Sequence, residues 1–182
     1  MHVVLKFKAF AILLNIASFF FVFSFFSCQS KIRKSDDSIG EKCVFPNIIN
    51  WSKFGKDTIC SGMLNKDLKI VIYNKSNHCN DCSLKLGLWK NIINQADTSR
   101  ISFIFFINAI NNEEEINSLL KIYEFDYPII IDKKNEFFEL NKLLKINDSD
   151  CFLLDRNNIV LLRGSPLYSQ EILDKYSNMI FQ

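Results

Sequence analysis

The stretch that decides the fold is residues 68–96, LKIVIYNKSNHCNDCSLKLGLWKNIINQA. Leu68–Tyr73 is a short, nearly continuous apolar run rich in β-branched residues, which is typical of a strand buried on both faces. Ser83–Ala96 places apolar residues at helical spacing, so an amphipathic helix that starts at Asp81 or Cys82 is predicted. A buried strand followed by an amphipathic helix indicates an α/β fold.

The rest of the chain continues this alternation. Further strands are predicted at Ile101–Ile107, Pro128–Asp132, Cys151–Asp155 and Ile159–Arg163, the last two forming a hairpin, and further helices at Glu113–Tyr123, Glu136–Leu144 and Ser169–Ile180. An extra N-terminal strand or hairpin is expected within Cys43–Met63. Strands joined by helices predict a mainly parallel central sheet, flanked by helices on both faces, with an antiparallel hairpin at its C-terminal edge.

Length and composition indicate one folded domain behind a short N-terminal segment. The chain has 182 residues, of which 48% are hydrophobic and 18 are Phe, too many for a disordered protein. Residues 1–27 carry two lysines and no acidic residue, so the chain from Cys28 onward has 20 basic and 20 acidic residues. Without a basic surplus, binding to nucleic acid is not expected.

The N-terminal segment is typical of a secretory signal. Two lysines precede the largely apolar run Ala9–Phe26, and a polar stretch follows at once. Residues 25–28, Phe-Phe-Ser-Cys, resemble the lipobox of bacterial lipoproteins, which implies a signal peptide over residues 1–27 and acylation of Cys28. An uncleaved membrane anchor is the alternative, because about 18 apolar residues can just cross a bilayer.

Residues 28–42 are polar and of mixed charge, and we expect them to form a flexible tether. The globular domain is then predicted to span residues 43–182. With either kind of N-terminus, this domain lies outside the cytoplasm, in the bacterial cell envelope and on the periplasmic side, and is held to a membrane by its N-terminal anchor.

The motif Cys79-Asn80-Asp81-Cys82 carries the predicted chemistry. Because it follows a buried strand and opens a helix, backbone N–H groups and the helix dipole would stabilise a thiolate there. Cys79, the outer sulfur, would attack a disulfide, and Cys82 would resolve the mixed disulfide. His78, when protonated, would favour the Cys79 thiolate, whereas Asp81 would oppose it.

A C-x-x-C motif also serves as half of a zinc site or as a structural clip. Zinc needs four ligands, whereas the chain from Cys28 onward offers one histidine, His78, and no second C-x-x-C. No metal and no cofactor are therefore expected. A permanent Cys79–Cys82 disulfide without turnover remains an alternative to a redox-active pair.

The order of strand, C-x-x-C, helix and later strands resembles the thioredoxin superfamily, in particular its membrane-tethered, extracytoplasmic thiol-disulfide oxidoreductases. The resemblance covers Leu68–Gln182 and includes FDYPIIID at 125–132 and FLLD at 152–155. It implies a thioredoxin-like fold that reduces or exchanges disulfides in exported proteins with disulfides or thiols, together with a redox partner that recharges the pair. A thiol peroxidase is less favoured, because Ile72 stands where that activity's proline is expected.

Three positions depart from the family pattern, and one of them is His78, which stands where the family has a tryptophan. The cis-proline that the family places opposite the C-x-x-C falls at about Ser149, and no proline lies between Pro128 and Pro166. The family's buried acid on the first strand maps near Tyr73 or Asn74, and neither is a carboxylate. A non-catalytic thioredoxin-fold lipoprotein, which acts as a binding or scaffolding module with a structural disulfide, is therefore the competing function.

The three remaining cysteines are expected to have structural roles. Cys43 and Cys60 precede the first core strand and are candidates for a disulfide that would staple this region, as is common in exported proteins. Cys151 is then the odd thiol, and it is expected to be buried and inert in a strand. A resolving or partner-linking role is its alternative.

Overall fold

The structure, a computed structural model, describes residues 37–60, 62–75, 84–109 and 112–180. The chain divides into two units, Met1–Ser35 and Asp36–Gln182, and every described residue belongs to the second. The predicted signal peptide and the lipidation site Cys28 therefore lie outside the described residues.

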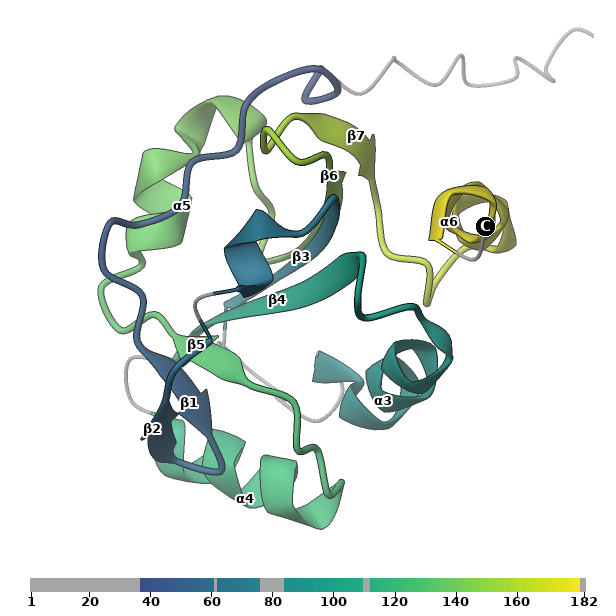
Figure 1. Ribbon diagram of the computed structural model, residues 1–182. Helices are drawn as coiled ribbons and strands as arrows, with labels where there is room; N and C mark the ends of the chain where they lie inside the picture. Colours follow the sequence, from purple (N-terminus) through teal and green to yellow (C-terminus); the bar gives the residue numbers. More distant parts are fainter. Residues whose placement is uncertain (1–36, 61, 76–83, 110–111, 181–182) are drawn as a thin grey trace, which may run out of the picture. The chain divides into compact units, whose positions relative to one another are not determined.

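The domain is built on one seven-stranded sheet with the strand order β2-β1-β5-β4-β3-β6-β7 (Figure 1). Its strands are β1 Trp51–Lys53, β2 Lys56–Thr58, β3 Leu68–Lys75, β4 Ile101–Asn108, β5 Ile129–Ile131, β6 Ser149–Leu154 and β7 Val160–Arg163. The strands β3 to β7 overlap the five predicted strands. The antiparallel pair of β1 and β2 is the expected N-terminal hairpin.

The sheet is mixed, and the prediction that it is mainly parallel is wrong. In the described sheet, β3 pairs with β4 and β4 with β5 in parallel, whereas the four other neighbouring pairs are antiparallel. The N-terminal hairpin adds antiparallel to β5, and after β5 the chain returns to pair with β3 in the opposite direction. These pairings join segments far apart in sequence, so the local pattern does not determine their direction.

Helices cover both faces of the sheet, with α3 and α6 on one side and α5 on the other (Figure 1). The helices are α3 Leu86–Gln95, α4 Glu113–Ile122, α5 Glu136–Leu140 and α6 Gln170–Ile180, and 3-10 turns lie at η1 Met63–Asn65 and η2 Lys142–Leu144. Ile116 and Leu120 of α4 are buried in the same cluster as the apolar residues of α3. The helix predicted at Glu113–Tyr123 is therefore confirmed as α4.

The helix predicted over residues 136–144 is interrupted at Asn141. Its side-chain amide donates to the carbonyl of Phe137 (2.7 Å), while its backbone N–H donates to Phe138 (3.1 Å) instead of continuing the α-helical pattern. The same amide group also exchanges two hydrogen bonds with the backbone of Val44, at 2.7 and 2.8 Å. A side chain that bonds to the preceding turn competes with the helix, which explains why α5 ends at Leu140.

Two hydrophobic clusters, one on each face of the sheet, form the core. Beneath α3, Trp89 packs edge-on against Phe103 and Phe105 of β4, with ring centroids 6.2 and 5.9 Å apart. On the other face, Phe106 stacks on Phe137 of α5 with centroids 4.2 Å apart. Because alternate residues of β4 enter both clusters, this Phe-rich strand is buried along its whole length, as its sequence predicts.

The segment before β1 is hydrogen-bonded to the turn between β6 and β7. Gly40 and Cys43 donate their N–H groups to the carbonyls of Val160 (2.9 Å) and Asn158 (2.8 Å), and Val160 donates to Glu41 (2.9 Å). The folded unit thus begins before Cys43, and it includes residues 40–42, which the sequence pattern assigns to a tether. The bonds also cover part of β7, which is an edge strand of the sheet.

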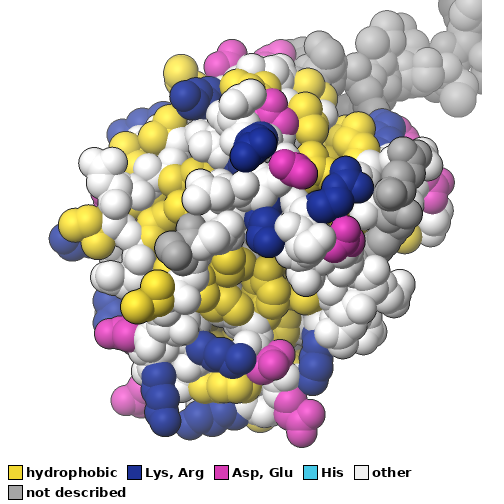
Figure 2. Space-filling model, viewed as in Figure 1, with side chains coloured by type: hydrophobic (Ala, Val, Ile, Leu, Met, Phe, Trp, Pro, Cys, Tyr) yellow, Lys and Arg dark blue, Asp and Glu magenta, His cyan; other side chains and the backbone are white. Residues whose placement is uncertain are grey.

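Charges of both signs are interspersed on the face of the domain shown in Figure 2, and hydrophobic side chains gather between them near its centre. Exposed ion pairs, such as Lys133 with Glu113 and Lys175 with Glu171, contribute little to stability because solvent screens them. Within the described ranges, no helix has the length and apolar character that crossing a bilayer requires.

Candidate active site

The four residues predicted to carry or tune the redox chemistry, Cys79, Cys82, His78 and Asp81, lie outside the described residues. The structure describes the chain on both sides of them. On the N-terminal side, β3 ends at Lys75. On the C-terminal side, the description resumes with Leu84, whose side chain is buried.

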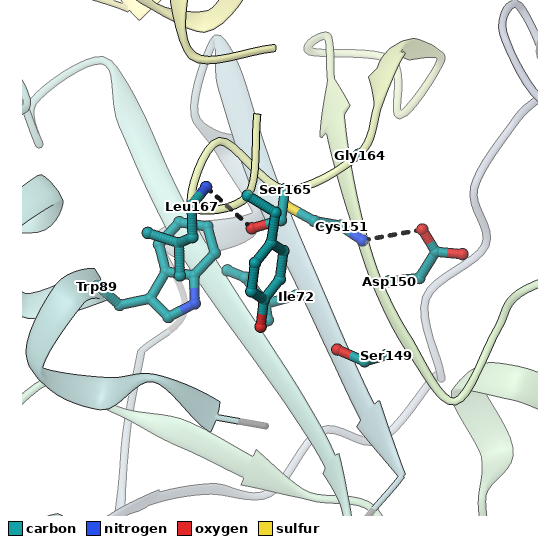
Figure 3. A pocket seen from close by; sticks show the side chains of 9 residues that line it. Ile72, Trp89, Ser149, Asp150, Cys151, Gly164, Ser165 and Leu167 are labelled. Atoms are coloured by element: carbon teal, nitrogen blue, oxygen red, sulfur yellow. Dashed lines mark hydrogen bonds between the residues drawn. The ribbon is translucent and has the colours of Figure 1, made fainter. Parts of the chain in front are cut away.

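A pocket of about 120 Å³ is lined by residues from both of these flanks (Figure 3). Ile72 comes from β3, three residues before the strand ends, and Trp89 comes from α3. The start of β6 and the loop between β7 and α6 complete the pocket. They contribute Ser149, Asp150, Cys151, Gly164, Ser165, Leu167 and Tyr168.

The pocket has buried apolar walls and an exposed aromatic side chain at its rim. Ile72, Trp89 and Cys151 are buried, whereas Tyr168 is 64% exposed. In the loop that forms the opposite wall, the Oγ of Ser165 accepts the N–H of Leu167 at 3.2 Å. An apolar hollow with a few polar groups at its edge can receive an apolar side chain of a partner while the backbone stays outside.

The position expected for the family's proline lies at this pocket. Ser149 begins β6 and pairs with Asn74 of β3, and the N–H of Lys75 donates to the carbonyl of Asp148 at 2.7 Å. This places the start of β6 beside the last residues of β3 before the C-x-x-C segment. The described part of the chain contains no cis peptide bond.

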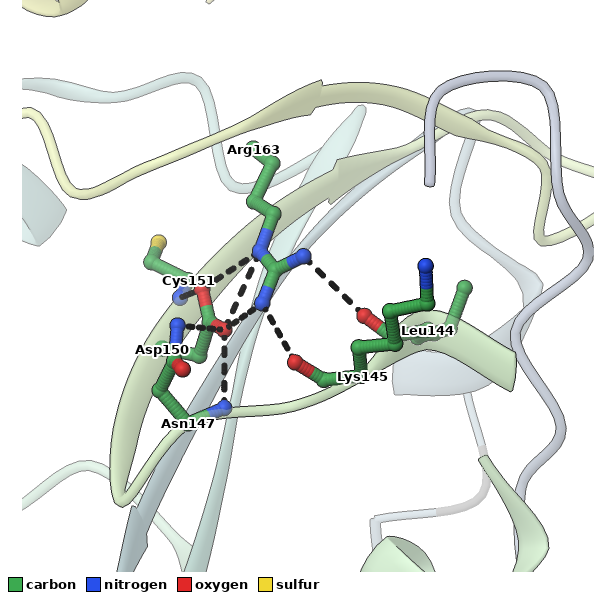
Figure 4. Close-up of polar contacts among 6 residues, drawn as sticks. All are labelled: Leu144, Lys145, Asn147, Asp150, Cys151 and Arg163. Atoms are coloured by element: carbon green, nitrogen blue, oxygen red, sulfur yellow. Dashed lines mark hydrogen bonds and ion pairs between the residues drawn. The ribbon is translucent and has the colours of Figure 1, made fainter. Parts of the chain in front are cut away.

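A part-buried ion pair holds the start of β6 (Figure 4). The Nε of Arg163 lies 3.1 Å from both carboxylate oxygens of Asp150, and its Nη1 donates to the carbonyl of Leu144 at 3.0 Å. This pair was not anticipated from the sequence. The available signal was the presence of opposite charges near the ends of two strands predicted to form a hairpin, which antiparallel pairing brings to the same end.

The expected helix from Asp81 or Cys82 to Ala96 is not continuous. Lys85 has a φ of 49°, which is left-handed and outside the helical region, and α3 begins only at Leu86. A left-handed residue interrupts the helical run because the chain before it cannot continue along the axis of the helix that follows it. The dipole of α3 therefore starts four residues after Cys82, not at the C-x-x-C itself.

Tyr73 and Asn74, which stand near the position of the family's buried acid, are both buried. The hydroxyl of Tyr73 donates to the Oδ1 of Asn135 at 2.7 Å, and its ring packs in the cluster under α5, on the face opposite Trp89. Burial raises the pKa of Tyr73 to about 12, helped by the negative charge of Asp132. Tyr73 therefore does not exchange a proton near neutral pH.

Cys151 is a buried free thiol, as predicted. Its Sγ lies 3.5 Å from the hydroxyl of Tyr176 in α6, which is also buried. Burial raises the pKa of Cys151 to about 12. A thiol that stays protonated at neutral pH is a poor nucleophile, so its expected inert role agrees with its environment.

The predicted disulfide between Cys43 and Cys60 is absent, because the structure holds both as free thiols. Cys43 is bonded to the turn between β6 and β7 at one edge of the sheet, whereas Cys60 follows β2 at the other edge. Among the described residues, no three His, Cys, Asp or Glu side chains are grouped so as to hold a metal ion.

Solved structures share this arrangement of strands and helices. A thiol:disulfide interchange protein from a Bacteroides species superposes with a TM-score of 0.55 at 11% identity, covering 80% of this chain and 93% of that one. StoA from Bacillus subtilis gives a TM-score of 0.50 at 18% identity, covering 72% and 99%. The fold is thioredoxin-like.

A third protein of this fold, from Chlorobium tepidum and assigned as the thiol:disulfide interchange protein DsbE, matches with a TM-score of 0.56 at 16% identity. The match covers 75% of this chain and 93% of that one. No protein-family model and no curated protein matches the sequence. The thioredoxin-like fold predicted from the C-x-x-C region is therefore confirmed by structure, where sequence similarity is low.

Proposed function

We propose that this protein is a thiol-disulfide oxidoreductase that acts through Cys79 and Cys82. The observation that carries the proposal is the position of Cys79-Asn80-Asp81-Cys82 between β3 and α3, whose residues Ile72 and Trp89 line one pocket. The thioredoxin-like fold and the interchange proteins that share it support the same chemistry. The buried thiols Cys43 and Cys151 do not compete, because burial keeps them protonated.

In the proposed reaction, the Cys79 thiolate attacks one sulfur of a substrate disulfide. The substrate's second sulfur leaves as a thiolate, and a mixed disulfide forms. Cys82 then loses its proton and attacks the Cys79 sulfur, which releases the first substrate sulfur as a thiolate. The substrate gains two electrons, Cys79 and Cys82 become a disulfide, and a dithiol redox partner reduces this disulfide again. His78 and Asp81 act on the pKa of Cys79 in opposite directions.

The proposed location is the bacterial cell envelope, outside the cytoplasm and on the periplasmic side, with Cys28 as the lipidated residue. Support comes from the sequence, in which a signal-like segment ends at a lipobox-like Phe-Phe-Ser-Cys. The substrates are then exported proteins with disulfides or thiols, and the lipid anchor joins the domain to the membrane. Mass spectrometry of the exported protein tests this, since an acylated N-terminal Cys28 is expected.

Cys79→Ser tests the oxidoreductase. We expect the wild-type protein to reduce insulin disulfides with dithiothreitol as reductant, Cys79→Ser to lose this turnover, and Cys82→Ser to accumulate a mixed disulfide. Cys60→Ser is the matched control, because Cys60 lies at the β2 edge of the sheet, away from the pocket, and should keep wild-type turnover.

The second candidate is a non-catalytic binding module whose Cys79–Cys82 disulfide is structural. It is favoured by Ser149, which stands at the pocket where the family has its proline. A reduction potential below about −300 mV together with no turnover would select this module over the enzyme.

A further inference from the structure

We propose that Arg163 is a positioning residue that, through Asp150, holds the start of β6 as one wall of the pocket in a chain that has no proline there. The proposal concerns the architecture of the wall, and its consequence for substrate binding rests on the proposed oxidoreductase function. Arg163 itself does not line the pocket, whereas Ser149, Asp150 and Cys151 do.

The guanidinium of Arg163 joins the side chain of Asp150 to two backbone carbonyls. Besides the bonds of Nε to Asp150, its Nη1 donates to the carbonyl of Leu144 (3.0 Å) and its Nη2 to that of Lys145 (2.9 Å). Nη2 also forms an ion pair with the Asp150 carboxylate. One rigid, planar group therefore ties Leu144, the last residue of η2, and Lys145, the residue after it, to Asp150 at the start of β6.

The carboxylate of Asp150 accepts further hydrogen bonds, and we call the ion pair of Arg163 and Asp150 with its hydrogen bonds the lock. It accepts the backbone N–H of Asn147 (3.2 Å), the side-chain amide of Asn147 (3.3 Å) and the N–H of Cys151 (3.0 Å). The side chains of Asp150 and Arg163 are only 6% and 14% exposed. Charge-assisted bonds shielded from water are stronger than exposed ones, so the segment from Asn147 to Cys151 is held in one shape.

The lock lies behind the pocket, on the opposite face of the sheet. Cys151 packs in the cluster with Trp89, whereas Phe152, the next residue, packs in the cluster with Phe137. The guanidinium carbon of Arg163 lies 5.3 Å from the centroid of the Phe152 ring, which fixes Arg163 on that second face. Through its described contacts, Arg163 therefore acts on a bound substrate by holding β6.

The start of β6, which forms this wall of the pocket, lies beside the last residues of β3 before the C-x-x-C segment. Ser149 pairs with Asn74, the last residue but one of β3, and the Lys75 N–H bonds to Asp148. A proline fixes a backbone by locking its φ. Here the same segment is fixed by a part-buried ion pair, so its shape depends on the side chain of Arg163.

The test uses Arg163→Ala and Arg163→Lys in the full chain, with Lys133→Ala as a control that removes only an exposed ion pair. Loosening a binding wall should raise the KM for a disulfide-containing protein by about tenfold in Arg163→Ala, with a much smaller change in kcat. Arg163→Lys should raise the KM less than Arg163→Ala does, because lysine keeps the positive charge but lacks the planar guanidinium group. Lys133→Ala should match the wild type.

A second measurement reports the wall without relying on turnover. Trp89 lines the pocket, and the other tryptophan, Trp51, can be replaced in a Trp51→Phe background. We expect acrylamide to quench Trp89 fluorescence more strongly in Arg163→Ala than in that background alone. If Arg163→Ala does not fold, Arg163→Lys provides the same two measurements.

Unchanged KM together with unchanged quenching in a folded variant would overturn the proposal. If the wild type shows no disulfide turnover at all, the oxidoreductase proposal fails on its own. Quenching of Trp89 fluorescence then tests the positioning role by itself. Stronger quenching in Arg163→Ala supports the role, and quenching equal to that of the Trp51→Phe background rejects it.

Discussion

At the scale of single residues, burial decides which thiols react. Cys43 and Cys151 are both buried, and the loss of hydration raises the pKa of each to about 12. For Cys43, the positive charge of Lys69 lowers the pKa but does not outweigh burial. At neutral pH both thiols stay protonated. Burial also raises the pKa of the partly exposed Cys60, which does not line the pocket, so the C-x-x-C pair remains the candidate.

The raised pKa of Cys151 predicts a loss of stability at alkaline pH. The folded thiol keeps its proton up to about pH 12, whereas the unfolded thiol ionises near its ordinary pKa of 9.0. Between these values the unfolded state binds fewer protons, so the stabilisation is complete below pH 9 and is lost as the pH rises toward 12. At pH 10 this thiol should account for about 1 kcal/mol of the decrease in unfolding free energy.

Urea unfolding at pH 7 and pH 10 measures this effect. The unfolding free energy of Cys151→Ala should fall less between pH 7 and pH 10 than that of the wild type, by about 1 kcal/mol. Lys133→Ala is the control and should keep the wild-type decrease, because it alters only an exposed ion pair. An equally large decrease in Cys151→Ala would show that this thiol is not the source.

At the scale of elements, Lys85 determines where α3 begins. With a φ of 49° it separates α3 from whatever precedes it, and the N–H groups of Leu88 and Trp89 bond back to its carbonyl at 3.0 and 3.1 Å. The first free N–H groups of α3 therefore belong to residues beyond the C-x-x-C. The first turn of α3 therefore does not include the C-x-x-C, so its free N–H groups do not belong to Cys79 or Cys82.

Lys85→Gly distinguishes this arrangement from a continuous helix. Glycine adopts a left-handed φ without strain, so the substitution should raise the unfolding free energy by about 1 kcal/mol. In a continuous helix it would instead lower it by about 1 kcal/mol. Chemical denaturation gives the sign directly, and Lys85→Ala serves as the control, because alanine has no advantage over lysine in a left-handed conformation.

At the scale of the whole domain, the N-terminal part of the chain reaches both edges of the sheet. Residues 40–43 bond to the turn between β6 and β7, and Asn141 holds the backbone of Val44. The hairpin of β1 and β2 then adds to β5 at the opposite edge. The segment from residue 40 to β2 therefore contacts both edges of the sheet, although the sequence pattern assigns residues 40–42 to a tether.

Truncation tests the role of this segment. A chain that starts at residue 36 should unfold at the same urea concentration as the full chain. A chain that starts at Pro46 loses the backbone bonds of Gly40, Glu41, Cys43 and Val44, and should be less stable by about 3 kcal/mol or more. Equal stability of the two shortened chains would mean that the segment is not part of the folded unit.

The local elements follow from the sequence alone, because their signals are local. The apolar run at Leu68–Tyr73 and the Phe-rich run at Ile101–Ile107 predict buried strands, and both are confirmed as β3 and β4. The turn residues at 156–158 predict the C-terminal hairpin, and it is confirmed as well. The C-x-x-C between a strand and a helix also pointed to the thioredoxin-like fold.

Tertiary structure alone decided how these elements meet. The antiparallel return of β6 beside β3 brings Ser149 to the pocket, and the pairing of β6 with β7 brings Arg163 to Asp150. The separation of Cys43 from Cys60 likewise follows from the strand order. These outcomes depend on contacts between residues far apart in the chain, whose geometry is set by packing and sheet order, and no local periodicity encodes them.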